Sequence, residues 1–268
     1  MTDVGRVGII GGAGWLGYAI ARALVHSAAV APHDLICSYR SRKPQDAIGC
    51  TWTSDNGELV DRSDVIILSV RPDDWMSVEA DAAGKLVISV MAGVPVADIG
   101  KRLGTARVAR ALPNAAAAIG FSYTPYFMHD AQPDDLAIVG AIFRSCGAVD
   151  AVAEESHIDY FTAMSGSGAA FPALLAEAMM NDAMGRGIPA EIAQRAAEQV
   201  IIGAGRLQEA DNTSPADTVK AFVDYNGTTA AGIIAMRKMG FDNAVRAGLD
   251  AAFRKAQSLS MTPEEDDA

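Results

Sequence analysis

The first candidate site for chemistry in this sequence is a glycine-rich turn near the amino terminus. Gly12, Gly14 and Gly17 form a G-x-G-x-x-G motif directly after a short apolar run and at the start of a predicted helix. In such a unit the first glycine permits a tight turn, the second lets the backbone approach a pyrophosphate, and the third allows close helix–strand packing. The helix start adds free N–H groups and partial positive charge. A purely structural turn is the alternative, but the motif favours a dinucleotide site made by Gly12, Ala13, Gly14, Trp15, Leu16 and Gly17.

The end of the second predicted strand indicates which dinucleotide is bound. NAD enzymes usually carry a carboxylate about 20 residues after the glycines, where it binds the ribose hydroxyls. This sequence instead reads SYRSRK at positions 38–43. Cations and hydroxyl groups suit a 2′-phosphate, although a solvated basic turn has the same composition. We therefore expect NADPH as the cofactor, with NADH used less well, and contacts from Tyr39, Arg40 and Ser41.

Two further loops follow later predicted strands. Val70, Arg71 and Pro72 lie at the carboxyl end of one apolar run, and Ala92 and Gly93 follow the next. Ligands of doubly wound sheets bind at the carboxyl ends of the strands. These five residues are therefore candidate cofactor contacts, although ordinary strand–helix turns would look the same.

The second half of the chain contains two hydroxyl-rich helix starts, MSGSGAA at 164–170 and NGTTAAG at 226–232. The free N–H groups of such a start can hold a carboxylate. Taken alone, each segment is more often a helix cap than a binding site.

Neither the three scattered cysteines nor the four separated histidines have the spacing of a zinc site or a disulfide framework.

Short apolar runs alternate with helical patterns through the first half of the chain. Because the runs lack polar alternation, both faces of each strand should be buried, which is typical of a parallel sheet covered by helices. Repeated strand–helix units imply right-handed crossovers and a doubly wound fold. The predicted strands are Arg6–Ile10, Leu35–Tyr39, Val65–Val70, Leu86–Val90 and Arg107–Ala111, and the predicted helices are Trp15–Ala28, Pro72–Ala82 and Pro95–Leu103.

From Glu154 onward only helical patterns remain, separated by glycine and proline breaks. The prediction is an α/β protein with an N-terminal Rossmann domain at residues 1–152, built on a doubly wound parallel sheet, followed by an all-α C-terminal domain at 153–268. The predicted C-terminal helices are Gly168–Met184, Pro189–Gln208, Gly227–Met239 and Asp242–Leu259.

The charge and hydropathy of the chain exclude some classes of binding partner. A net charge of −11 over 268 residues repels phosphate backbones, and there is no basic stripe to offset it, so nucleic acid is not expected. No apolar run approaches the roughly 20 residues that span a bilayer. The chain also leads directly into a strand without a basic, then apolar, targeting segment, so we expect a cytoplasmic protein that does not bind membranes.

Taken together, the motifs resemble the pyrroline-5-carboxylate reductase family. That family couples an SGSGPA helix start to a later SPGGTT start, matched here by SGSGAA at 165–170 and DYNGTT at 224–229. VRP at 70–72, SVMAGV at 89–94 and RALPN at 110–114 resemble further family segments in the same order. The resemblance runs from about residue 6 to about residue 260, nearly the whole chain.

The resemblance implies hydride transfer from NADPH to the C=N carbon of pyrroline-5-carboxylate, giving proline. It also implies a homodimer through the C-terminal helices, often assembled further into a ring. Thr229 and Ser167 would be the catalytic residues, with Thr229 near the imine nitrogen, and no metal is implied. The substrate would be bound by Ser165, Asp224, Asn226, Gly227 and Thr228, and Asn114 would join the cofactor site.

An imine reductase makes modest demands on the protein, because positioning supplies much of the barrier reduction. No histidine or lysine base is required, and Thr229 would orient the imine nitrogen or relay a proton from water. A β-hydroxyacid dehydrogenase is disfavoured because no catalytic lysine is found near residues 165–185.

Asp224 departs from the family pattern, which has a serine there. A carboxylate at this position would repel the acid group of the family substrate unless it points away. One interpretation is that Asp224 caps the following helix or interacts favourably with its dipole. Another is a reductase of a small cyclic imine that lacks the acid group, and a third is a non-catalytic NADPH-binding protein.

Overall fold

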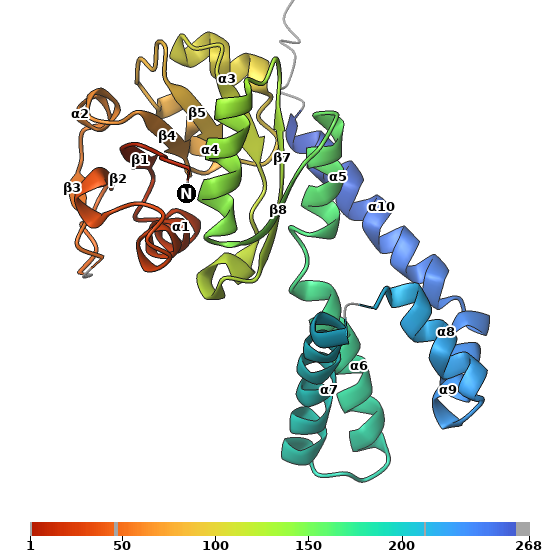
Figure 1. Ribbon diagram of the computed structural model, residues 1–268. Coiled ribbons are helices and arrows are strands. Elements are labelled where there is room, and N and C mark those ends of the chain that lie inside the picture. The colour runs from red at the N-terminus through yellow and green to blue at the C-terminus, as the bar shows by residue number, and fades with distance from the viewer. Residues whose placement is uncertain (1, 46–47, 212, 261–268) are drawn as a thin grey trace, which may run out of the picture. The chain divides into compact units, whose positions relative to one another are not determined.

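The computed structural model describes residues 2–45, 48–211 and 213–260 (Figure 1). They fall into two compact units, each treated by itself below. The first runs to Ser167 and takes in the chain again from Ala252, and the second is Gly168–Ala251. Among the described residues, no helix is long and apolar enough to cross a bilayer. The domain boundary expected after residue 152 stays a prediction.

The first unit is built on one eight-stranded sheet with the order β3-β2-β1-β4-β5-β6-β7-β8. The five predicted strands are confirmed to within two residues at each end. All neighbouring pairs are parallel except β6 and β7. The strands are β1 (Val7–Ile10), β2 (Leu35–Ser38), β3 (Thr51–Thr53), β4 (Val65–Leu68), β5 (Leu86–Ser89), β6 (Val108–Ala111), β7 (Ser122–Met128) and β8 (Gly147–Ala151).

Alternate residues of the central strands enter two separate cores, one on each face of the sheet. Val65 and Ile67 face the core that α1 and α4 cover, whereas Ile66 and Leu68 face the core covered by α2 and α3 (Figure 1). Burial on both faces is the physical reason that these strands are continuous apolar runs. The helices of this unit are α1 (Trp15–His26), α2 (Asn56–Asp61), α3 (Val96–Leu103), α4 (Pro133–Arg144) and α5 (Ser156–Met164), with short 3-10 helices η1 (Pro32–Asp34), η2 (Pro72–Ser77) and η3 (Ala115–Ile119).

One predicted helix is wrong. The segment Pro72–Ala82 contains only the 3-10 helix η2, which ends at Ser77, and Val78 is already extended. Trp75, Val78 and Ala82 are its only buried side chains among the described residues, and most of the others are exposed or polar, so a longer helix would gain little packing.

The second unit consists of helices. These are α6 (Ala170–Gly185), α7 (Ala190–Asp211), α8 (Pro215–Tyr225), α9 (Thr228–Lys238) and α10 (Phe241–Ser260), the last of which passes into the first unit at Ala252. Helices α6 and α7 pack as one hairpin, and α8 packs on α9. The four predicted C-terminal helices are confirmed, whereas α5 and α8 were not predicted. Few side chains of this unit are buried in a single chain.

Candidate active site

The glycine-rich turn joins β1 to α1, as its sequence predicts. Gly11 has a φ of +81°, and its N–H donates to the Ser38 hydroxyl at 3.1 Å. The N–H of Ala13 donates to the carbonyl of Ser38 at 3.2 Å. Two hydrogen bonds from the end of β2 therefore hold the turn against the sheet.

Gly12 and Gly17 are glycines because another backbone or strand lies against them. A Cβ added at Gly12 would lie 2.7 Å from the Cβ of Cys37, and one at Gly17 would lie 2.6 Å from the carbonyl oxygen of Gly11. Both distances are shorter than any real contact, so larger residues would push α1 off the turn. The close approach at Gly17 is the packing role expected of the third glycine of a dinucleotide motif. The tight turn expected at Gly12 has its positive φ at Gly11 instead, and Gly12 is required to be small because Cys37 lies against it.

The start of α1 fits a pyrophosphate. The first helical hydrogen bond runs from the N–H of Tyr18 to the carbonyl of Gly14 at 2.8 Å, so the N–H groups of Trp15, Leu16 and Gly17 precede the helical ladder. Within the part of the chain that the structure describes, no side chain caps this helix. Free N–H groups at a helix start are the usual ligands of a phosphate.

Cys37 lies directly beneath Gly12 and is fully buried. A hydrogen bond with Cys50, followed by burial, raises the pKa of the Cys37 thiol. The thiol is therefore protonated at neutral pH, and its role under the turn is packing.

The basic segment after β2 is exposed, and one of its cations already has a partner. The Arg40 guanidinium donates to Asp74 of η2 at 2.8 Å, with 78% of the arginine side chain exposed. The N–H of Tyr39 donates to the carbonyl of Thr53 at 3.1 Å, which fixes the chain just before Arg40. A 2′-phosphate at this place would compete with Asp74 for Arg40. This carboxylate could not be identified from the sequence, because it lies 34 residues away.

The loops after β4 and β5 lie at the same edge of the sheet as the glycine turn. Strand order reverses between β1 and β4, the position at which doubly wound sheets bind ligands. A Cβ added at Gly11 would lie 2.5 Å from the Ser69 carbonyl oxygen and 3.1 Å from a side-chain carbon of Val70. Val70 is therefore a neighbour of the turn, and Arg71 and Pro72 follow it. Ala92 and Gly93 follow β5, and Gly93 has a φ of +77°.

Asn114 connects the end of β6 to the turn that follows α5. Its side-chain N–H donates to the carbonyl of Ser165 at 3.0 Å, and its side-chain oxygen accepts from the N–H of Ala116 at 3.0 Å. The buried Ser165 hydroxyl donates to the carbonyl of Phe161 at 3.1 Å, whereas Ser167 is half-buried. Asn114 therefore positions one of the predicted substrate residues, a contact that the sequence did not reveal.

The predicted substrate residues of the second unit lie between α8 and α9. Asn226 ends α8 with a φ of +57°, and Gly227 is the N-cap of α9. Thr228 and Thr229 occupy the first two helical positions. Among the described residues no side chain caps α9, so its first N–H groups can bind an anion.

The interpretation of Asp224 as a cap of α9 is wrong. Asp224 belongs to the last turn of α8, where its carboxylate pairs with Lys220 one turn earlier. The pair is largely exposed, so water screens it, but the cation offsets part of the negative charge next to the Gly227–Thr229 helix start.

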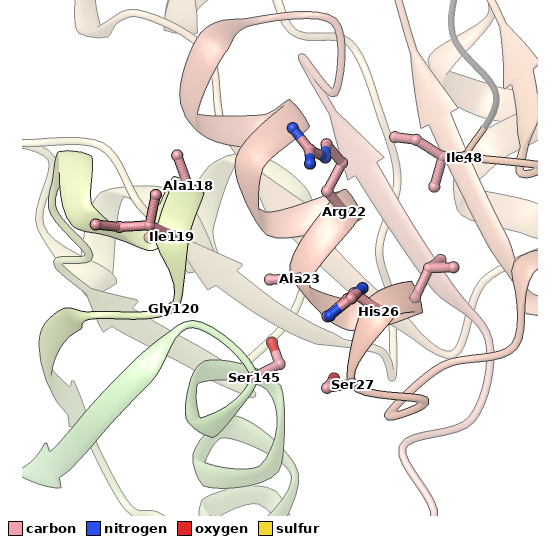
Figure 2. Close-up of a pocket in the computed structure, with 11 residues that line it drawn as sticks. Arg22, Ala23, His26, Ser27, Ile48, Ala118, Ile119, Gly120 and Ser145 are labelled. Atoms are coloured by element: carbon pink, nitrogen blue, oxygen red, sulfur yellow. The ribbon is translucent and has the colours of Figure 1, made fainter.

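A cavity of about 410 Å³ lies elsewhere in the first unit (Figure 2). It is lined by Arg22 and His26 of α1, by Ile119 of η3 and by Ser145, so it opens near the carboxyl end of α1. Because α1 rises about 18 Å over its twelve residues, this cavity is not the dinucleotide site. Among the described residues, no group of three metal-ligating side chains is found.

The fold and the glycine turn define a nucleotide-dependent oxidoreductase. Residues 6–93 match the family model described as NADP oxidoreductase, coenzyme F420-dependent, and residues 155–259 match the model for pyrroline-5-carboxylate reductase dimerisation. Pyrroline-5-carboxylate reductase of Synechocystis sp. is 34% identical over 95% of this chain and 98% of its own length. The chain belongs to the pyrroline-5-carboxylate reductase family, so the predicted resemblance is confirmed.

Solved structures agree. A pyrroline-5-carboxylate reductase from Coxiella burnetii superimposes with a TM-score of 0.86 at 27% identity, covering 97% of this chain and all of the other. The Plasmodium falciparum pyrroline carboxylate reductase, solved with NADP bound, has a TM-score of 0.79 at 23% identity and covers 97% of this chain and all of the other. The latter likeness bears on the fold alone.

Proposed function

We propose that this protein reduces the C=N bond of pyrroline-5-carboxylate with NADPH and gives proline. The observation that carries the proposal is the membership of nearly the whole chain in this reductase family. NADPH fits three features of the first unit: the tightly packed glycine turn, the uncapped start of α1 and the cations after β2. The uncapped start of α9 fits the substrate carboxylate.

Each residue of the proposed site has a separate task. Bound NADPH supplies the hydride for the imine carbon. The N–H groups of Trp15, Leu16 and Gly17 hold its pyrophosphate, and Arg40 binds the 2′-phosphate. Tyr39, Ser41, Val70–Pro72, Ala92, Gly93 and Asn114 complete the cofactor side.

On the substrate side, the N–H groups of Gly227 and Thr228 bind the carboxylate. The hydroxyls of Thr229 and Ser167 orient the imine nitrogen, and water supplies its proton through Thr229. Ser165 and Asn226 shape the two turns. Holding the hydride donor and the imine carbon together supplies much of the rate, so no strong acid is required.

A second candidate function rests on Asp224. A carboxylate in this loop would favour a small cyclic imine without an acid group. The pairing of Asp224 with Lys220 weakens this alternative, because the ammonium offsets the repulsion of a substrate carboxylate. For pyrroline-5-carboxylate we expect Lys220→Ala to raise KM and Asp224→Ser to lower it, each by about two- to fivefold as for an exposed ion pair. If Asp224→Ser instead lowers the activity on pyrroline-5-carboxylate, Asp224 does not repel the substrate carboxylate, and the second candidate function is wrong.

We also propose a homodimer formed by the second unit, which assembles further into a ring. Its support is the large number of exposed apolar side chains on helices α6 to α10, such as Leu174, Ile192 and Val200. Contiguous exposed apolar surface usually marks an interaction site. The cytoplasmic location expected from the sequence stays a prediction that cell fractionation would test.

The decisive experiment is the initial rate of NADPH oxidation by the purified protein with pyrroline-5-carboxylate, with NADH in parallel. A saturable rate that prefers NADPH, together with formation of proline, is expected. NADPH binding without turnover, followed by reduction of an imine that lacks a carboxylate, would favour the second candidate. Binding without turnover of any imine would leave only a non-catalytic role.

A further inference from the structure

Arg110 is a buried charge on a central strand. It lies on β6 between alanines, and only 2% of its side chain is exposed. One guanidinium nitrogen donates to Glu155 and the other to Asp159, both at 2.9 Å. Its Nε has no hydrogen-bond partner among the described residues. Arg110 therefore joins β6 to the first turn of α5.

Glu155 extends this connection to α3. The Glu155 oxygen that accepts from Arg110 also accepts from the N–H of Val96 at 2.9 Å. Val96 is the first residue of α3, and its N-cap, Pro95, has no side-chain donor or acceptor with which to cap it. Glu155 thus caps α3 from another element and fixes the end of the loop that carries Ala92 and Gly93.

The RALPN segment holds α5 at both ends. Arg110 pairs with Glu155 and Asp159 at the start of the helix, and Asn114 binds the carbonyl of Ser165 just after its end. Four residues of extended chain and nine of helix both span about 13 Å, so the segment and α5 can run side by side. The turn from Ser165 to Ser167 is therefore fixed relative to β6.

A gain in folding stability does not explain why Arg110, Glu155 and Asp159 form a buried ion cluster. Buried ion clusters seldom stabilise a protein more than apolar side chains of the same volume. A buried N–H of Arg110 without a partner adds a further cost. What a guanidinium does provide is a rigid, planar fork that fixes two carboxylates at defined positions.

We propose that Arg110 is a positioning residue of the reductase site. Through Glu155 and Asp159 it places the Ser165–Ser167 turn, on the substrate side, relative to the Ala92–Gly93 loop, on the cofactor side. The inference rests on the proposed function, and it adds a residue that does not itself touch substrate or cofactor.

Arg110→Lys is the test variant, because a lysine keeps the charge but cannot hold both carboxylates in a fork. Arg107→Lys is the matched control. Arg107 lies three residues earlier, and its guanidinium donates to the buried Asp135 at 3.1 and 2.6 Å and to the carbonyl of Gly84 at 2.8 Å. None of these hydrogen bonds involves Glu155, Asp159 or Ser165. Both variants disturb an arginine–carboxylate pair at β6 or directly before it. Only Arg110→Lys disturbs the contacts to Glu155 and Asp159 that are proposed to position the two loops.

The kinetic readout is kcat per NADPH-binding site, with the isotope effect of NADPH deuterated at the transferred position. For Arg110→Lys we expect kcat to fall about tenfold to a hundredfold and the isotope effect to rise, because misplacement slows hydride transfer itself. Arg107→Lys should stay within about twofold of the wild-type protein in kcat. Equal losses in the two variants, with an unchanged isotope effect, would overturn the inference.

Hydrogen exchange of the full-length protein gives a readout that does not depend on turnover. Arg110→Lys should raise exchange in both segments 90–97 and 163–168, and Arg107→Lys in neither. Unchanged exchange in these segments would refute the inference even if activity falls. A wild-type protein that does not reduce pyrroline-5-carboxylate would refute the proposed function, while the exchange comparison would still decide the role of Arg110.

Discussion

Arg40, which we propose binds the 2′-phosphate of NADPH, already forms an ion pair within the protein. It lies after β2, where the ribose of a bound dinucleotide is expected, and it is paired with Asp74 in the structure. The pair is mostly exposed, so its contribution to stability is small. A phosphate can therefore displace the carboxylate of Asp74 at little cost.

We expect Arg40→Ala to raise KM for NADPH about tenfold or more, since a charge-assisted hydrogen bond to the 2′-phosphate is lost, and to leave KM for NADH nearly unchanged. Asp74→Ala should do the opposite and lower KM for NADPH, because it removes the competing carboxylate. Initial rates with both cofactors measure these effects. Equal changes for NADPH and NADH would contradict a 2′-phosphate site.

Thr229 lies in the first turn of α9, and we propose that its hydroxyl contacts the imine nitrogen. Thr229→Ala should lower kcat about tenfold to a hundredfold and leave the dissociation constant of NADPH unchanged, because the lost contact forms on the substrate side. Thr213→Ala, at an exposed threonine between α7 and α8, is the control. Steady-state kinetics and a fluorescence titration with NADPH separate the two effects. A loss of NADPH affinity equal to the loss of kcat would count against this role.

At the level of elements, we propose that the pyrophosphate site depends on the close packing of α1 on the glycine turn. Gly17→Ala would place a methyl group 2.6 Å from the Gly11 carbonyl oxygen, so the helix start must move. We expect the dissociation constant of NADPH to rise about tenfold or more. Gly203→Ala in α7 adds the same methyl group where the described structure has no atom within 4 Å. NADPH titration of both variants gives the comparison, and an equal affinity in both would show that the close approach is unimportant.

The strands that could be predicted from the sequence are those whose apolar composition indicates that both faces are buried. The runs VGII, LICS, VIIL and LVIS are β1, β2, β4 and β5 because a strand covered on both faces consists mainly of apolar residues. Strand β7 contains Pro125 and hydroxyl-bearing residues, and β8 is largely exposed, so neither is a continuous apolar run. The pairing of β7 with β6 and with β8 depends on contacts far apart in sequence.

At the level of the whole molecule, the second unit lacks a core of its own. Apolar side chains of α7, including Ile192 and Val200, are more than half exposed in one chain. We expect Val200→Asp to dissociate the homodimer, because burying an unpaired carboxylate in an apolar interface is costly. Light scattering after size-exclusion chromatography measures the mass, and Glu198→Gln on the same helix is the control. A Val200→Asp protein that keeps twice the mass of one chain would place the interface elsewhere.

The sequence by itself determined the features that depend on neighbouring residues. These are the glycine turn after a buried strand, the helix starts predicted at Gly168 and Gly227 and observed at Ala170 and Thr228, and the order of motifs that identified the family. Each depends on backbone conformation and burial over a few residues, which local composition reports directly.

Only the tertiary structure decided which charged and polar groups pair. The partners are separated by 34 residues for Arg40 and Asp74, by 45 for Arg110 and Glu155, and by 51 for Asn114 and Ser165. In the sequence, each member of such a pair looks the same as a solvated surface residue or an ordinary helix cap. The distance between them is set by the packing of whole strands and helices, and this is why the RALPN segment became interpretable only once α5 was seen against β6.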